Sequence, residues 1–149
     1  MTGKTSRAEG GIPPRIQAEL IDAARVAAKN AYVPYSHFPV GAAVLTGSGE
    51  IVTGVNIENA SFGLTVCGER VAIQTAAAQG HRSILAVAVS APKAPGTTPC
   101  GACRQVMNEF KPVIGDMMVL MDGLDSVLAI PLGDLLPGAF GPRDLERAE

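Results

Sequence analysis

Cys67-Gly68-Glu69-Arg70 is the first of two short segments that together contain all three cysteines of the chain. The second segment is Pro99-Cys100-Gly101-Ala102-Cys103-Arg104, whose two cysteines stand three positions apart. At the start of a helix, residues with this spacing lie on one face, so both sulfurs can reach one metal ion. Three thiolates are one ligand short of a closed tetrahedral zinc site, and an open position for water is typical of a catalytic zinc.

Glu69 is the candidate for the acid–base role that such a site requires. Zinc lowers the pKa of a bound water, but the resulting hydroxide still needs a group that moves protons around it. Glu69 is two residues from Cys67, so on a helix it points away from that sulfur and is not expected to share the metal. Arg70, Arg104 and the N-termini of two helices would offset the net negative charge of three thiolates around Zn²⁺.

Three alternatives are a structural zinc site, a redox Cys-x-x-Cys pair and three unrelated buried cysteines. A structural site favours a fourth Cys or His nearby, whereas the only histidines, His37 and His81, stand close to neither segment. A thioredoxin-like pair follows the first strand, but Cys100 and Cys103 come two-thirds of the way along the chain. Free cysteine also packs as a small hydrophobe. We favour the catalytic zinc site.

The composition limits the class of protein and its partners. The 149 residues are 47% hydrophobic with a formal net charge of −2, enough for one domain with a substantial core. The absence of Lys/Arg runs argues against nucleic acid or an anionic membrane as partner. We identify neither a secretory signal nor a membrane-spanning stretch. An odd number of cysteines with metal-like spacing fits a reducing cytoplasm. We expect a disordered tail at 1–11 and a single domain at 12–149.

Apolar periodicity and Pro or Gly boundaries predict an alternation of helices and strands. The helices are expected at 13–31, 67–79, 100–110 and 134–136. The strands are expected at 39–46, 51–55, 84–90, 117–121 and 126–130. Residues 84–90 are apolar on both faces, which is typical of a central strand covered by helices. The prediction is a three-layer α/β/α fold with a mixed five-stranded sheet, and both cysteine segments at strand-to-helix junctions, where such sheets bind ligands.

Four motifs occur in an order that is specific to one enzyme family. They are Ala31-Tyr32-Val33-Pro34-Tyr35-Ser36-His37-Phe38-Pro39-Val40-Gly41-Ala42-Ala43, Asn56-Ile57-Glu58-Asn59-Ala60-Ser61-Phe62, Pro99-Cys100-Gly101-Ala102-Cys103-Arg104-Gln105 and Leu135-Leu136-Pro137-Gly138-Ala139-Phe140-Gly141-Pro142. Cys67-x-Glu69 with the Pro-Cys-x-x-Cys segment is a variant of the zinc-deaminase signature. From about Ile16 to Leu145 the chain resembles the homotetrameric cytidine deaminases.

The resemblance implies zinc-dependent hydrolysis of cytidine and 2′-deoxycytidine to uridine and 2′-deoxyuridine, with release of ammonia, in pyrimidine salvage. It implies that Cys67, Cys100 and Cys103 hold one zinc per subunit. Glu69 would carry a proton from the zinc-bound water to N3 of the pyrimidine and assist loss of ammonia from C4. Arg70 would hydrogen-bond zinc-bound sulfur and offset its charge.

The resemblance also implies a set of nucleoside contacts. Asn56 and Glu58 would hydrogen-bond the ribose 3′-hydroxyl, and the other implied substrate contacts are Phe38, Ala60, Phe62 and Phe140. The Pro-Gly break before Phe140 cannot continue a helix, so we expect this ring to be displayed rather than packed in its own domain. In the family it enters a neighbour's active site, which implies a homotetramer with shared sites. The chain departs from the family at two positions, with Gly68 for the usual Ala and Phe62 for a common Tyr.

Two rival functions remain open at this point. One is a zinc deaminase acting on another aminopyrimidine, such as blasticidin S or a free base, but Asn56, Glu58 and the Leu135-to-Pro142 motif favour nucleosides. The other is a zinc-stabilised binding module without catalysis, or an RNA-editing deaminase. The presence of Glu69 argues against an inactive module, and the lack of Lys/Arg clusters argues against nucleic acid.

Overall fold

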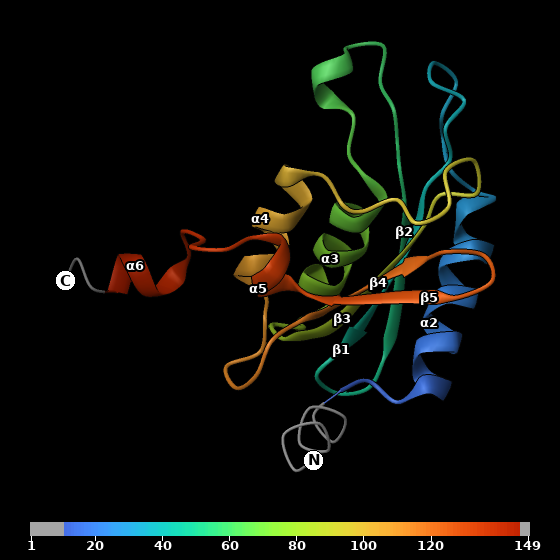
Figure 1. Ribbon diagram of the computed structural model, residues 1–149. Coiled ribbons are helices and arrows are strands. Elements are labelled where there is room, and N and C mark those ends of the chain that lie inside the picture. Colours follow the sequence, from blue (N-terminus) through green and yellow to red (C-terminus); the bar gives the residue numbers. More distant parts are fainter. Residues whose placement is uncertain (1–10, 147–149) are drawn as a thin grey trace.

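Five strands form one mixed sheet in the order β2-β1-β3-β4-β5 (Figure 1). The computed structural model describes residues 11–146, so of the tail expected at 1–11 all but Gly11 lies outside the described residues. The strands are β1 (Gly41–Thr46), β2 (Ile51–Val55), β3 (Ile84–Ser90), β4 (Met118–Asp122) and β5 (Val127–Pro131). β3 and β4 run parallel, whereas the other neighbours pair antiparallel. The predicted mixed five-stranded sheet is confirmed.

Helices cover both faces of this sheet and complete three layers (Figure 1). They are α2 (Pro14–Ala28), α3 (Gly68–Ala78), α4 (Gly101–Glu109), α5 (Leu132–Leu135) and α6 (Pro142–Glu146), with a 3-10 turn, η1 (Phe62–Leu64). α2 packs on one face of the sheet, and α3 and α4 pack on the other. The expected α/β/α arrangement is therefore confirmed. Within residues 11–146, none of the helices combines the length and apolar character that a membrane crossing requires.

Side chains of β1 alternate between the two faces, so the sheet separates two hydrophobic cores. Ala42 and Val44 belong to the core beneath α3 and α4, whereas Ala43 and Leu45 belong to the core beneath α2. β3 is buried along both faces, as a central strand covered by helices must be. This burial explains why residues 84–90 form an unbroken apolar run instead of an alternating one.

Two glycines let the helices lie directly against the sheet. A Cβ atom on Gly41 would lie 2.0 Å from the carbonyl oxygen of Ala24 in α2. A Cβ atom on Gly54 would lie 2.3 Å from the amide nitrogen of Ala72 in α3. Both distances are far below van der Waals contact, so the strands meet the helix backbones only because these positions carry no side chain.

The structure corrects several predicted boundaries. α2 ends at Ala28 and not near residue 31, because Asn30 and Ala31 donate to the carbonyls of Ala27 and Ala28 in tight i-to-i−3 turns. Other differences are a later start for β1, at residue 41, and an earlier start for α5, at residue 132. β4 and β5 each lie one residue later than predicted, and η1 and α6 were not predicted. Both unpredicted elements are one turn or little more, too short for a periodic pattern.

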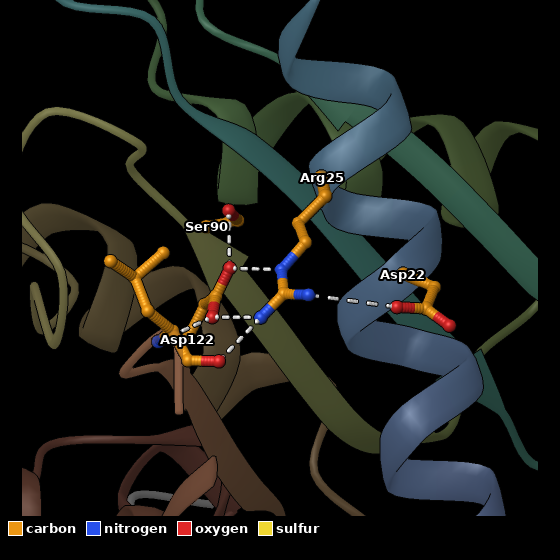
Figure 2. A network of polar contacts seen from close by, with 5 residues as sticks. Asp22, Arg25, Ser90 and Asp122 are labelled. Atoms are coloured by element: carbon orange, nitrogen blue, oxygen red, sulfur yellow. Dashed lines mark hydrogen bonds and ion pairs between the residues drawn. The ribbon is translucent and has the colours of Figure 1, made fainter. Parts of the chain in front are cut away.

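An ion pair between a half-exposed arginine and a buried aspartate joins α2 to the carboxyl ends of β3 and β4 (Figure 2). Arg25 donates from Nε and Nη2 to the two carboxylate oxygens of Asp122, both at 2.7 Å. The Ser90 hydroxyl donates to the same carboxylate at 2.8 Å. Asp122 is 4% exposed, and the Arg25 hydrogen bonds lower the pKa of its carboxyl to about 2. The network anchors the edge of the sheet from which the chain leaves β3 toward Cys100.

Candidate active site

A cluster of three sulfurs forms where α3 and α4 begin. Cys67 and Cys100 are the residues immediately before the two helices, both with extended backbone, and Cys103 lies in the first turn of α4. The Sγ atoms of Cys67 and Cys100 are 3.9 Å apart, and those of Cys100 and Cys103 are 3.4 Å apart. All three sulfurs lie within 4.8 Å of one another. Helix starts therefore bring together thiols from distant parts of the sequence.

The donor set and its spacing fit Zn²⁺. Tetrahedral zinc with Zn–S bonds of about 2.3 Å spaces its sulfurs roughly 3.8 Å apart, which agrees with the cluster. All three cysteines are free, so no disulfide competes for the sulfurs. Within residues 11–146, no histidine or carboxylate joins the group as a fourth ligand. Zinc bound here keeps one position open.

Hydrogen bonds around the cluster stabilise negative charge on Cys67, whereas the bond to Cys67 and burial raise the pKa of Cys103. The Cys103 thiol, the Arg70 guanidinium and the Cys100 thiol lower the pKa of Cys67 to about 5, against the effect of burial. Arg70 Nη2 donates to Cys67 Sγ at 3.4 Å. At α4 the Cys103 amide donates to Cys100 Sγ at 3.5 Å, but Cys67 receives no such amide from α3. Of the two helix N-termini expected to stabilise sulfur, only that of α4 donates an amide hydrogen bond to a cysteine. At α3 the Arg70 side chain donates to Cys67 instead.

Glu69 lies buried against the cluster. Its side chain is 4% exposed, and its Oε2 is 3.5 Å from Cys103 Sγ. Burial raises the pKa of this carboxyl, and the charge on Cys67 acts in the same direction. The contact of this carboxyl with the cluster is made to Cys103. A carboxyl so placed can exchange a proton beside the open position.

Asn56 ties the segment that carries Phe38 to the sheet. Its Oδ1 accepts from the Val40 amide at 2.9 Å, and its Nδ2 donates to the Phe38 carbonyl at 2.8 Å. The Asn56 side chain therefore uses two of its four hydrogen-bonding positions within the protein. No sequence pattern predicts these two bonds, because both partners are backbone groups.

Glu58 holds the same loop from the other side. Its Oε1 accepts from the amides of Tyr35 and Ser36, each at 3.0 Å. The bonds from Ser36 lower the pKa of the Glu58 carboxyl, which is therefore ionised at neutral pH. Oε2 receives no hydrogen bond from within residues 11–146 and is free for another donor.

Of the remaining residues expected to contact substrate, Ala60, Phe62 and Phe140 are exposed in the single chain. Phe62 is 74% exposed and packs edge-on against Tyr35, with ring centroids 5.7 Å apart. Ala60 is exposed, and Phe140 is 61% exposed after the Pro-Gly break, as expected for a displayed ring. Phe38 is partly buried beside Asn56. A Cβ on Gly68 would lie 3.1 Å from the Val40 carbonyl, so an Ala here would need a small backbone adjustment.

Arg104 and His81 have structural partners. Arg104 donates to the carbonyls of Pro99 and Leu135, both at 2.8 Å, and so joins the second cysteine segment to the C-terminal part of the chain. His81 Nε2 lies 2.7 Å from a carboxylate oxygen of Glu50, so His81 is not a freely solvated loop residue as its turn-like sequence suggested. Neither residue is within the sulfur cluster.

A buried carboxyl beside three sulfurs that leave a zinc ion one open position, on an α/β/α fold, is typical of a hydrolytic zinc enzyme. Comparison with known proteins gives its family. The model of the cytidine and deoxycytidylate deaminase zinc-binding region matches residues 14–121. The chain belongs to this family.

Relatives support the same assignment over most of the chain. A cytidine deaminase of Halalkalibacterium halodurans is 47% identical over 127 residues, which are 85% of this chain and 95% of the relative. A cytidine deaminase of Mycobacterium tuberculosis is 46% identical over 121 residues, covering 81% and 86% of the two chains. The crystal structure of cytidine deaminase from Burkholderia pseudomallei superposes with a TM-score of 0.76 at 45% identity, covering 83% of this chain and 98% of that one.

Proposed function

We propose that this enzyme hydrolyses cytidine and 2′-deoxycytidine to uridine and 2′-deoxyuridine, releasing ammonia, in pyrimidine salvage. One observation carries the proposal: the buried Glu69 carboxyl lies 3.5 Å from Cys103 Sγ beside a cluster of sulfurs with one metal position left open. Relatives named cytidine deaminase at 46% to 47% identity support the substrate class.

Cys67, Cys100 and Cys103 hold one zinc ion per subunit. When bound, zinc lowers the pKa of a water molecule and supplies a hydroxide nucleophile near neutral pH. Arg70 donates to Cys67 Sγ and offsets part of the negative charge of three thiolates. Without this offset, the excess negative charge would work against formation of the hydroxide.

Glu69 moves the protons of the reaction. It accepts a proton from the attacking water and delivers it to N3 of the pyrimidine. It then takes the remaining proton of that water from the C4 hydroxyl and gives it to the amino group, which leaves as ammonia as the C4–N bond breaks and the C4=O bond forms. The raised pKa of its buried carboxyl supports this task, because a group that both accepts and donates a proton works best with a pKa near the working pH. Water and cytidine are consumed, and uridine and ammonia are formed.

Asn56 and Glu58 bind the ribose 3′-hydroxyl. Asn56 retains one N–H, and Glu58 retains Oε2, after their bonds to the backbone of the 32–40 loop. Phe38 packs against the nucleoside, and Ala60 and Phe62 lie beside the sugar. A site that bonds this hydroxyl rejects analogues without it, because buried polar groups would lose their partner. The chain has no Lys/Arg run to pair with a 5′-phosphate.

The active unit is a homotetramer of cytoplasmic subunits, each folded as a single domain over 12–149, with a tail at 1–11. Exposed rings at Phe62 and Phe140 support contacts between subunits, since such residues are enriched at interfaces. A cavity of about 360 Å³ beside α3, lined in part by Ile57, Leu64 and Val71, offers a further apolar surface. Phe140 enters the neighbouring active site and stacks near the pyrimidine.

Three free thiols support a reducing compartment, as proposed for a cytoplasmic protein.

The test is an ammonia-release assay on purified protein with its zinc content measured in parallel. Cytidine and 2′-deoxycytidine should turn over with similar kcat/KM, whereas cytosine and cytidine 5′-monophosphate should be poor substrates. Blasticidin S serves as the competing aminopyrimidine. The proposal is wrong if the monophosphate equals the nucleosides, or if blasticidin S or cytosine is the better substrate.

A further inference from the structure

We propose that Gln105 and Asn108 are positioning residues that fix Phe140 for its place in the neighbouring subunit, an inference that rests on the proposed role of Phe140. Gln105 Nε2 donates to the Phe140 carbonyl oxygen at 2.9 Å, and Asn108 Nδ2 donates to the same oxygen at 3.1 Å. We call these two bonds the carbonyl clamp. A carbonyl oxygen has two lone pairs, and the clamp occupies both.

The clamp holds the backbone of Phe140 and leaves its ring free. Gln105 and Asn108 stand three positions apart on α4, so their side chains reach out from one face of the helix. Asn108 is 5% exposed, while the Phe140 ring is 61% exposed. The Pro137-Gly138 break explains why the chain leaves α5, but the two amides decide where the ring is then presented.

Gly141 makes room for the buried half of the clamp. A Cβ on Gly141 would lie 2.6 Å from Asn108 Nδ2, and the only other atom within 4 Å is Asn108 Cγ. The backbone of Gly141 is outside the left-handed region, so a side chain would be tolerated there in every other respect. Among residues 11–146, the Asn108 amide is therefore the group that a side chain at Gly141 would displace, which links this position to the clamp.

The clamp also connects Phe140 with the zinc ligands of its own subunit. α4 follows directly after Cys100, carries Cys103 in its first turn and presents the side-chain amides of Gln105 and Asn108. Arg104, which lies between Cys103 and Gln105 in the sequence, donates to the Leu135 carbonyl and so holds the start of the C-terminal segment. α4 therefore fixes the position of the Phe140 backbone relative to the metal site of the same subunit.

Single substitutions test the clamp by separating KM from kcat. Gln105→Ala and Asn108→Ala should each raise KM for cytidine about 3- to 10-fold, the range of one lost hydrogen bond. The values of kcat should stay within about twofold, and zinc content should be unchanged. Gln105 is exposed, so its truncation tests the proposal even if Asn108→Ala does not fold. Glu109→Ala, at the next exposed position of α4, is the matched control and should leave KM unchanged.

A double-mutant cycle tests the link between Gly141 and Asn108. Gly141→Ala should raise KM as Asn108→Ala does, because the new Cβ displaces the Asn108 amide. In the Asn108→Ala background the same substitution meets no atom and should add almost nothing, so the two effects are not additive. Additive effects would show that Gly141 acts independently of the clamp and would overturn this part of the proposal.

Phe140→Ala separates failure of the clamp from failure of the proposed function. If Phe140→Ala raises KM but Gln105→Ala, Asn108→Ala and Gly141→Ala all leave it within twofold of wild type, the clamp is overturned and the role of Phe140 stands. If Phe140→Ala leaves KM unchanged, the proposed role of the ring is wrong, and the positioning role falls with it.

Discussion

The Oε2 atom of Glu69 lies 3.5 Å from the Sγ atom of Cys103, although 34 residues separate them in the sequence. The contact exists because α3 and α4 begin together and each carries one of the two residues in its first turn. Helix starts, and not flexible loops, thus fix the Glu69 carboxyl and the Cys103 sulfur relative to each other. A change of the Glu69 carboxyl alone should leave the ligands where they are.

Glu69→Gln should retain zinc and bind cytidine but lose most of its turnover. Glutamine keeps the shape of glutamate but cannot carry a proton, and acid–base catalysis contributes roughly 10²- to 10⁴-fold to a rate. Steady-state kinetics with metal analysis measures both effects, and Glu109→Gln is the control on α4. A Glu69→Gln enzyme with near-normal kcat would exclude this residue from proton transfer.

Cys100→Ala should abolish zinc binding and destabilise the protein. Two thiolates cannot complete the site, and the binding energy of a metal is also folding energy. Metal analysis of the purified variant and thermal unfolding with and without added zinc measure the result. We expect added zinc to raise the melting temperature of the wild type but not of the variant. Zinc retained at wild-type level would remove Cys100 from the ligand set.

Phe140→Ala should raise KM for cytidine while each subunit keeps its zinc. The ring is 61% exposed in the isolated chain and has its proposed contact only in an assembly. Light scattering at assay concentration should find a tetramer for the wild type. An isolated subunit should be inactive even with its metal bound, and a fully active monomer would contradict the shared site.

Asp122→Asn should reduce stability at neutral pH but not in strong acid. The pKa of Asp122 is lowered from about 3.8 to about 2 by Arg25, so the ion pair stabilises the fold fully above about pH 4. Its contribution is lost as the pH falls through the folded-state value. We expect a difference of about 1–2 kcal/mol between wild type and variant, reduced from the full shift because Arg25 is 42% exposed.

Urea unfolding of both proteins at pH 6 and at pH 2 measures this difference. Because both lose zinc in acid, comparing the two cancels the effect of the metal. An Asp122→Asn difference that is the same at both pH values would show that Arg25 and Asp122 do not interact as an ion pair.

Gly54→Ala should destabilise the protein by roughly 1–3 kcal/mol or more, the cost of forcing atoms into a packed core. Its Cβ would lie 2.3 Å from the Ala72 amide nitrogen, so α3 would have to move away from β2. Gly63→Ala is the matched control, since a Cβ there has no neighbour within 4 Å. Equal unfolding free energies for the two variants would show that α3 does not lie this close to β2.

The features that could be predicted from the sequence are those with a local signal. Residues 84–90 gave the bounds of β3 because an unbroken apolar run needs no long-range information. The starts of α3 and α4 followed from the cysteine segments, and their ends followed from Gly80 and Pro112 beyond them. These local signals were enough for the layer order and for grouping three cysteines with Glu69.

The contacts that could not be predicted involve backbone groups, or charged side chains that lie far apart in the sequence. The bonds from Glu58 to the Tyr35 and Ser36 amides have no pattern in the sequence, because every residue but proline carries an amide. Arg25 and Asp122 lie 97 residues apart, and nothing near either one indicates the other. Such contacts depend on the register of the whole sheet, which side-chain periodicity does not specify.

The 33-residue separation of Cys67 from Cys100 has a consequence for the unfolded chain. A metal that remains on both thiols closes this stretch into a loop and removes conformations that the open chain would explore. For a cross-link of that length, the chain-entropy model gives about 3–4 kcal/mol. Zinc would then do for this protein what a disulfide does for a secreted one. A reducing compartment leaves such a cross-link intact, whereas a chelator opens it.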